Sequence, residues 1–185
     1  MEIIFRRRFE AAHRLVEGRN KNTLCSQPHG HSWNVSVSIG LEKNFQLNGK
    51  DNIMLPFESL KSKWHSWIDH QLDHAFFCNV RDPLKEFLLV DNPKGRLVVF
   101  QGDPTTEMIA FCMSQKLRVF LLEISEDLEF KWLQLDETLT NSVKIDRDMS
   151  NGFAEKFLDE GARPNSEIQP WWRRADLSTS DPSTR

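Results

Sequence analysis

The segment WNVSVSIGL, residues 33–41, decides the fold of this 185-residue chain. Its apolar residues alternate with small or polar ones, at Val35, Val37, Ile39 and Leu41. Successive side chains of an extended strand point to opposite faces, so this alternation predicts a strand with one buried face and one solvated face. Such half-buried strands are typical of antiparallel sheets. The fold class then depends on what flanks this strand.

A second strand is expected before it, at residues 2–9, where Ile3, Phe5 and Phe9 share one face. After it, Asn48-Gly49 marks a turn, and the period then changes. Apolar residues recur every three or four positions, which predicts an amphipathic helix with Pro56 in its first turn. These helical positions are Phe57, Leu60, Trp64, Ile68 and Leu72.

A second helix is expected from Asp103-Pro104, with Asp103 as N-cap and Pro104 at the first helical position. Alternation returns at residues 128–132 and 143–145, and the short apolar run 97–100 could form an extra strand. After about residue 150 the chain is polar and irregular, and its last eight residues, 178–185, are expected to be disordered. The order of two strands, two helices and two strands predicts an α+β domain.

Composition narrows the function. With 39% hydrophobic residues and a net charge of −3, the chain is typical of a globular protein and gives no reason to expect nucleic acid or a membrane as partner. Apolar runs stay well short of the roughly 20 residues that span a bilayer, and the amino terminus lacks a secretory signal, so a cytoplasmic location is expected. Three widely spaced cysteines argue against a disulfide framework and leave room for a free thiol.

Three histidines gather around the first pair of strands. His29 and His31 are two residues apart, so on an extended backbone they point to the same face. His13 follows the first strand and would meet them if the two strands pair antiparallel. Three neutral imidazoles with a fourth position open are typical of catalytic zinc, although copper, nickel and iron also suit imidazole. The alternative interpretation is three hydrogen-bonded or surface histidines.

Several motifs then match a known family in order. They are FEAAHRL (9–15), CSQPHGHSWNVSV (25–37), LDHAF (72–76), DPTTE (103–107) and DET (136–138). The chain thereby resembles the 6-pyruvoyltetrahydropterin and 6-carboxytetrahydropterin synthases over residues 1–145. The resemblance implies the tunnelling fold, a ββααββ antiparallel sheet with two helices on one face. It also implies trimers that close into a barrel and stack into a homohexamer, a dimer of trimers.

The resemblance also implies roles for individual residues. As zinc ligands it implies His13, His29 and His31. As catalytic groups it implies the base Cys25 and the proton-transfer pair Asp73 and His74. As substrate-binding residues it implies Glu137, which would anchor the pterin ring, together with Thr105 and Thr106 from a neighbouring subunit. Taken alone, Cys25 reads more simply as an inert thiol, Asp73-His74 as a polar helix end and Glu137 as a solvated strand end.

The implied activity is that of a zinc-dependent lyase acting on 7,8-dihydroneopterin triphosphate. Only three residues separate Cys25 from His29, which resembles the 6-carboxytetrahydropterin synthases of queuosine biosynthesis. The alternatives are 6-pyruvoyltetrahydropterin synthase, a side-chain-cleaving relative, or a non-catalytic homologue that binds pterin or metal. The expected organisation is a synthase domain at residues 1–150 and a polar, partly disordered extension at 151–185. Pro56 stands where the family usually has an acidic residue, and the stretch 78–103 is longer than in compact members.

Overall fold

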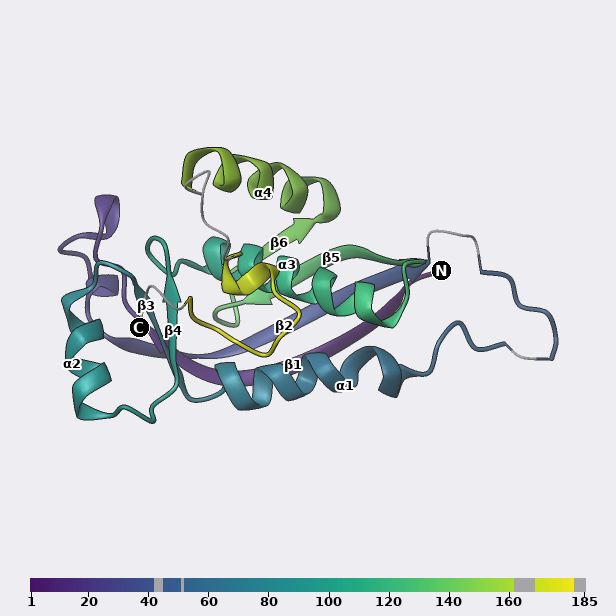
Figure 1. Ribbon diagram of the computed structural model, residues 1–185, viewed down its shortest axis with the longest axis horizontal. Coiled ribbons are helices and arrows are strands. Elements are labelled where there is room, and N and C mark those ends of the chain that lie inside the picture. The colour runs from purple at the N-terminus through teal and green to yellow at the C-terminus, as the bar shows by residue number, and fades with distance from the viewer. Residues whose placement is uncertain (42–44, 51, 162–168, 182–185) are drawn as a thin grey trace.

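The computed structural model describes residues 1–41, 45–50, 52–161 and 169–181. Its centre is a six-stranded sheet with the order β4-β3-β1-β2-β5-β6 (Figure 1). The strands are β1 Ile3–His13, β2 His29–Leu41, β3 Ala75–Asn79, β4 Leu97–Phe100, β5 Leu128–Asp136 and β6 Ser142–Asp146. The main helices are α1 Phe57–Trp67, α2 Pro83–Asp91, α3 Thr106–Ile124 and α4 Arg147–Gly161. Single helical turns lie at η1 Gly18–Asn20, η2 Leu24–Ser26, η3 Ile68–Leu72 and η4 Trp171–Arg173.

The long pair β1 and β2 forms the spine of the sheet. The two strands are antiparallel in continuous register, from Ile3 opposite Ile39 to His13 opposite His29. Both run further than the apolar alternation indicates, because main-chain pairing continues through the histidines after the alternation has ended. The expected antiparallel partnership of the first two strands is therefore confirmed.

The sheet is mixed because β3 and β4 run parallel to β1. The extra strand expected at residues 97–100 is confirmed as β4. β3 is not predicted from the sequence, because its core, Phe76-Phe77-Cys78, is a short unbroken apolar run directly after a helix. A parallel crossover needs a long connection, and the residues between β3 and β4 form α2. The α+β class is confirmed, with one strand (β3) and two helices (α2 and α4) more than expected.

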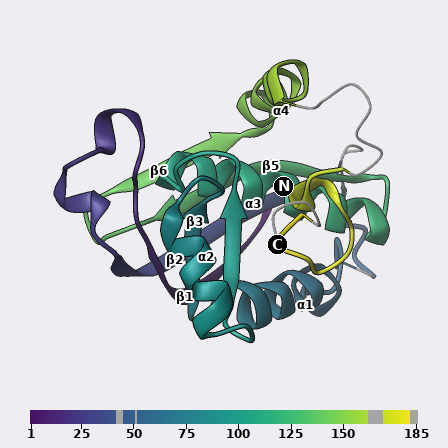
Figure 2. The ribbon, with the colours of Figure 1, turned by 60° about the vertical axis from the view of Figure 1, so that its left-hand side comes forward.

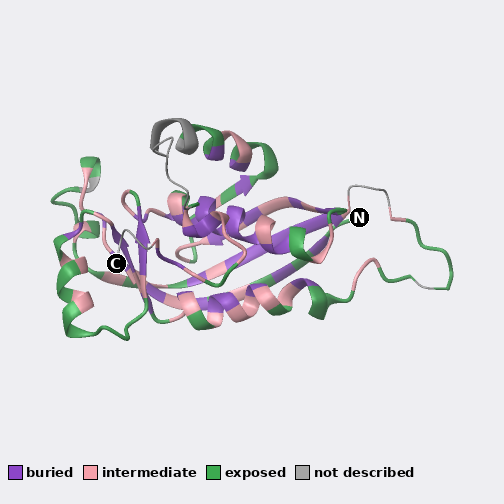
Figure 3. Cartoon of the chain, viewed as in Figure 1, coloured by how far each residue is buried: buried purple, intermediate pink, exposed green. Residues whose placement is uncertain are grey.

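Helices α1 and α3 cover one face of the sheet (Figure 2). They pack against each other, and the Trp67 ring meets the Phe120 ring edge to face. Pro56 lies at the N-cap of α1, one residue before the helix begins. The first expected helix ends early as α1, and its last turn is the π-helical η3. Figure 3 shows the buried residues concentrated along the central strands and along the faces of these two helices.

The start expected for α3 is wrong by two residues. Thr105, not Asp103, is the N-cap, and its hydroxyl accepts a hydrogen bond from the amide of Met108 at 3.3 Å. The Asp103 carboxylate instead accepts the amides of Val16 and Glu17, at 3.0 and 2.9 Å. Asp103 therefore ties the segment after β1 to the start of α3 and does not cap the helix.

The region after residue 150 is more regular than expected. Helix α4 continues to Gly161, and residues 169–181 fold back onto α3 with Trp171 and Trp172 buried. The expected disorder is wrong for residues 178–181, which are packed and hydrogen-bonded, whereas residues 182–185 lie outside the described part. None of the helices in the described ranges is long and apolar enough to cross a membrane.

Candidate metal centre

The three predicted histidines converge at the end of the β1–β2 pair. His13 is the last residue of β1 and lies opposite His29, the first residue of β2, while His31 follows on the same face. The ring centroids lie 4.5 Å apart for His13 and His29, 5.1 Å for His13 and His31, and 5.0 Å for His29 and His31. One ligand nitrogen from each ring lies within 4.8 Å of the others. The antiparallel register therefore assembles a group that could bind one metal ion.

Main-chain carbonyls set the tautomers of two of these rings. His13 Nδ1 lies 2.9 Å from the carbonyl oxygen of Pro104, and His29 Nδ1 lies 2.8 Å from that of Gln27. A carbonyl only accepts, so each Nδ1 must carry the proton and each Nε2 keeps a free lone pair. An imidazole held in this way is the usual arrangement of a metal-ligating histidine.

Two of the candidate ligand nitrogens are shielded from solvent. His13 and His31 both have a buried Nε2 without a hydrogen-bond partner among the described residues. Burial lowers the pKa of His13 to about 4 and also lowers the pKa of His31, so both rings are neutral at pH 7. A buried, neutral nitrogen without a partner is costly unless something binds it. These residues therefore fit a metal ion.

The Trp33 side chain packs against two of the three histidines. Its fully buried ring meets His13 and His31 edge to face, with both centroid distances 5.3 Å, and its indole N–H donates to the Ala11 carbonyl at 3.1 Å. This role of Trp33 is not among those predicted from the sequence, although Trp33 lies two residues after His31 and shares its face by simple alternation. The carbonyls of Pro104 and Gln27 are not predicted either, because nothing local in the sequence identifies them.

Glu137 and Thr106 reach the centre from two other elements. Glu137 follows β5, and its Oε1 lies 3.7 Å from His13 Nε2 and 3.9 Å from His31 Nε2. Thr106, the first residue of α3, donates its hydroxyl to the same oxygen at 2.9 Å. Thr106 and Glu137 of the same chain are thus in direct contact, whereas the expected contribution of Thr105 and Thr106 to a neighbouring subunit's site stays a prediction. Thr105 caps α3 beside them.

Cys25 lies on the loop that leads to His29. It occupies the single turn η2 with its side chain exposed, and its carbonyl accepts the Leu15 amide at 2.8 Å. The close group of potential ligand atoms in the described residues contains the three histidines and not this thiol. Cys25 is thus near the centre in sequence but does not belong to the ligand group.

Asp73 and His74 form the expected pair at the end of η3. The Asp73 carboxylate binds His74 Nδ1 at 2.7 Å and accepts the Glu10 amide at 2.9 Å. Burial opposes ionisation, but these hydrogen bonds hold the pKa of Asp73 below its ordinary value. His74 has a φ of 60°, a conformation that is uncommon without glycine, and its side chain is 76% exposed.

This pair does not join the histidine centre within one chain. The His74 amide donates to the carbonyl of Glu10, three residues before His13 on β1. Three strand residues span roughly 10 Å. The imidazole of His74 is thus presented to solvent beside the centre.

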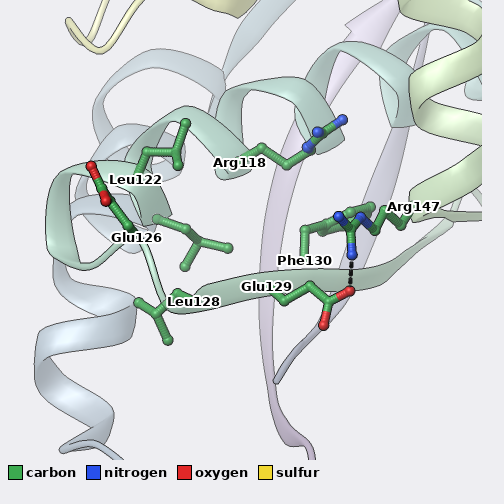
Figure 4. A pocket seen from close by; sticks show the side chains of 8 residues that line it. Arg118, Leu122, Glu126, Leu128, Glu129, Phe130 and Arg147 are labelled. Carbon is green, nitrogen blue, oxygen red and sulfur yellow. Dashed lines mark hydrogen bonds and ion pairs between the residues drawn. The ribbon is translucent and has the colours of Figure 1, made fainter. Parts of the chain in front are cut away.

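A separate cavity of about 170 Å³ lies at the other end of the sheet. Figure 4 shows its lining from α3 and β5, with Arg147 paired to Glu129. Leu128 in its wall lies opposite Leu41, the last residue of β2, whereas His29 is the first. The twelve residue steps from His29 to Leu41 span roughly 40 Å, so this cavity is not part of the metal centre.

Fold and centre together define the class, an α+β tunnelling-fold protein with a histidine cluster at one end of its central strands. The chain belongs to the 6-pyruvoyl tetrahydropterin synthase family, whose sequence model matches residues 2–148. Members of this family are pterin synthases. The match covers all nine residues named above as ligands, catalytic groups or substrate contacts.

Individual relatives agree with this assignment. A probable 6-carboxy-5,6,7,8-tetrahydropterin synthase of Halobacterium salinarum is 29% identical over 118 residues, which are 63% of this chain and 69% of that protein. A 6-pyruvoyltetrahydropterin synthase of Plasmodium vivax has a similar structure, with a TM-score of 0.55 and 20% identity over 80% of this chain and 97% of that one. An uncharacterized protein of Wolinella succinogenes gives a TM-score of 0.59 at 20% identity, over 80% and 98%. At these identities the two structures support the fold alone.

Proposed function

We propose that this chain is a zinc-dependent lyase that acts on 7,8-dihydroneopterin triphosphate, most specifically a 6-carboxytetrahydropterin synthase of the queuosine pathway. The observation that carries the proposal is the preformed group of His13, His29 and His31, with each ring presenting one nitrogen to a common point. The relative from Halobacterium salinarum and the short spacing from Cys25 to His29 support the carboxy product. The alternative product is 6-pyruvoyltetrahydropterin.

Zinc held by the three imidazoles would act as a Lewis acid on the hydroxyl oxygens of the substrate side chain, which makes the adjacent C–H more acidic. Residues of the chain would carry out the two proton transfers. Cys25 would take the carbon-bound proton as a thiolate, because its loop leads directly to His29. Asp73 would keep the His74 ring in one tautomer while that imidazole moves the second proton.

The exposed imidazole of His74, hydrogen-bonded to the half-buried Asp73, favours a site completed by another copy of the chain. Each chain would present this pair to a neighbour, consistent with the homohexamer expected from the resemblance. Cys25 is exposed as well, so both groups are open to a shared pocket. In this arrangement the histidine centre of one chain and the exposed pair of the next would face one substrate.

The position of Glu137 favours a contact different from the expected pterin anchor. Its Oε1 faces the nitrogens that would bind the metal, and Thr106 holds it there. We therefore propose that Glu137 meets the hydroxyl-bearing side chain of the substrate, next to the metal. Thr105 and Thr106 would remain substrate contacts at the start of α3.

One experiment tests the proposal. The zinc-loaded protein is incubated with 7,8-dihydroneopterin triphosphate, and the products are identified by mass spectrometry. A carboxy product accompanied by acetaldehyde and triphosphate is expected. A pyruvoyl product would identify the protein as a 6-pyruvoyltetrahydropterin synthase. If the substrate binds to the protein but is recovered unchanged, the non-catalytic homologue is favoured.

A further inference from the structure

Lys116 is a buried charge that the proposed chemistry does not use. It lies on α3, its side chain is fully buried, and it takes no part in the metal centre. Its Nζ donates to three main-chain carbonyls, those of Trp171 at 2.9 Å, Arg174 at 2.9 Å and Ser178 at 3.2 Å. An ammonium group has three N–H donors, so the three carbonyls satisfy it completely.

All three carbonyls belong to one short segment, residues 169–181, which is closed on itself. The Trp171 amide donates to the Asp181 carboxylate at 2.7 Å, and the Arg174 guanidinium donates to the Ser180 carbonyl at 2.8 Å. Asp176 lies 3.6 Å from the Lys116 Nζ. On the α1 side, Lys63 donates to the Ala175 carbonyl at 2.7 Å. The segment therefore forms a loop around the ammonium.

The same segment covers the outer edge of β4. The indole N–H of Trp171 donates to the Val99 carbonyl at 3.0 Å. The carbonyls of Arg96 and Phe100 accept the amides of Phe76 and Val80, on the side of β3. Carbonyls alternate in direction along a strand, so that of Val99 points away from β3. β4 is the end strand of the sheet, and Trp171 thus occupies a position where a further strand would pair.

Aromatic packing holds the segment in this position. The Trp171 ring lies 5.7 Å from that of Phe100 on β4 and 6.3 Å from that of Trp67 on α1, and Trp172 lies 5.1 Å from Phe111 on α3. The segment is thus anchored on one strand and two helices. Figure 1 shows it lying across the body of the protein next to α3.

We propose that residues 169–181 are an intramolecular clasp, fastened by Lys116, that closes the β4 edge of the sheet and prevents another copy of this chain from adding a strand there. An unprotected edge strand is a template for pairing with other chains, and covering it is a known protection. Any association between copies must then use other surfaces of the domain. This inference does not depend on the metal or on the substrate.

The test compares Lys116→Met with Lys61→Met, a matched change on α1 away from the clasp. Methionine has a similar volume but leaves the three carbonyls without their donor. Trypsin cleavage after Arg173 and Arg174 should become roughly tenfold faster or more in Lys116→Met, because proteolysis follows the open population. Hydrogen exchange in residues 97–101 should accelerate, and light scattering should show assemblies larger than those of the wild type. The Lys61→Met protein should behave as the wild type.

Unchanged cleavage and exchange in a folded Lys116→Met protein would overturn the fastening role. Faster exchange without larger assemblies would overturn the claim that the clasp blocks strand addition. If circular dichroism shows that Lys116→Met does not fold, Trp171→Phe tests the edge directly, since it keeps an aromatic ring and removes the indole N–H that donates to Val99. That variant should exchange several-fold faster at residues 97–101, and wild-type exchange there would contradict the proposal.

Discussion

The hydroxyl of Thr106 donates to Glu137 Oε1 at 2.9 Å, and this bond holds a carboxylate 3.7 Å from the free nitrogen of His13. The first residue of α3 thus fixes the direction of a side chain that follows β5. The bond lies within one chain, so this part of the centre exists before any assembly. Removing the Thr106 hydroxyl therefore tests how much the position of the Glu137 carboxylate contributes to the reaction.

Thr106→Val should lower kcat/KM roughly 10- to 100-fold, because a hydrogen bond to a charged group contributes about 1.5–3 kcal/mol. Valine keeps the shape of threonine, so zinc content should stay at the wild-type level. Steady-state kinetics and elemental analysis measure the two effects. Thr140→Val, an exposed change in the β5–β6 turn, is the control. Wild-type kinetics in Thr106→Val would show that the bond does not position Glu137 for the reaction.

The metal prediction concerns stoichiometry. The purified protein should hold about one zinc ion per chain, and His29→Ala or His31→Ala should lose it, since two imidazoles bind zinc much more weakly than three. Elemental analysis measures the content directly. His70→Ala is the matched control and should keep its zinc. His70 is exposed, and its Nδ1 binds the Ser66 carbonyl within α1 and η3. Full zinc content in both variants would exclude this site.

The thiol prediction separates chemistry from binding. Cys25→Ala should reduce turnover roughly 10²- to 10⁴-fold, the usual contribution of a general base. Zinc content and pterin affinity should change little, because the thiol is not one of the grouped ligand atoms. Ser26→Ala controls for disturbance of the same loop. If Cys25→Ala turns over at the wild-type rate, another group is the base.

The pH prediction concerns Lys116. Burial lowers its pKa to about 8 from an ordinary value of 10.5. Between these values Lys116 binds more protons in the unfolded chain than in the folded chain, so its own contribution to the free energy of unfolding should rise with pH from about 8 to about 10.5, by on the order of 2–3 kcal/mol. Urea unfolding of the wild type and of Lys116→Met at pH 7.5, 9 and 10 isolates this contribution. Burial raises the thiol pKa values of Cys78 and Cys112, which changes stability in the opposite direction over this range, but equally in both proteins, so their effect cancels in the comparison. A wild-type advantage that shrinks with rising pH would contradict the assignment.

The assembly prediction follows from the exposed imidazole of His74, which the proposed mechanism places at a site shared between chains. A shared site requires more than one chain, so the active species should be a hexamer of about 130 kDa, six times 21.7 kDa. Multi-angle light scattering at working concentration measures the mass, and dilution should lower specific activity as the assembly dissociates. An active monomer would exclude the shared-site arrangement.

The sequence by itself determined the spine of the sheet and the grouping of the three histidines. Alternation at residues 33–41 requires a strand with one buried face, and the spacing of His29 and His31 places both rings on that face. Antiparallel pairing with the first strand then brings His13 opposite His29. These conclusions need only the period of a strand and one pairing, so local patterns in the sequence were sufficient.

Only the tertiary structure decided what surrounds the ligands and what closes the sheet. The carbonyl that sets the His13 tautomer comes from Pro104, 91 residues away, and a carbonyl has no sequence signature. The approach of Glu137 depends on where α3 begins, which the sequence misplaced by two residues. Lys116 reads as an ordinary surface lysine until residues 171–178 fold over it. In each case the deciding contact joins groups distant along the chain, and its geometry exists only after the helices have packed onto the sheet.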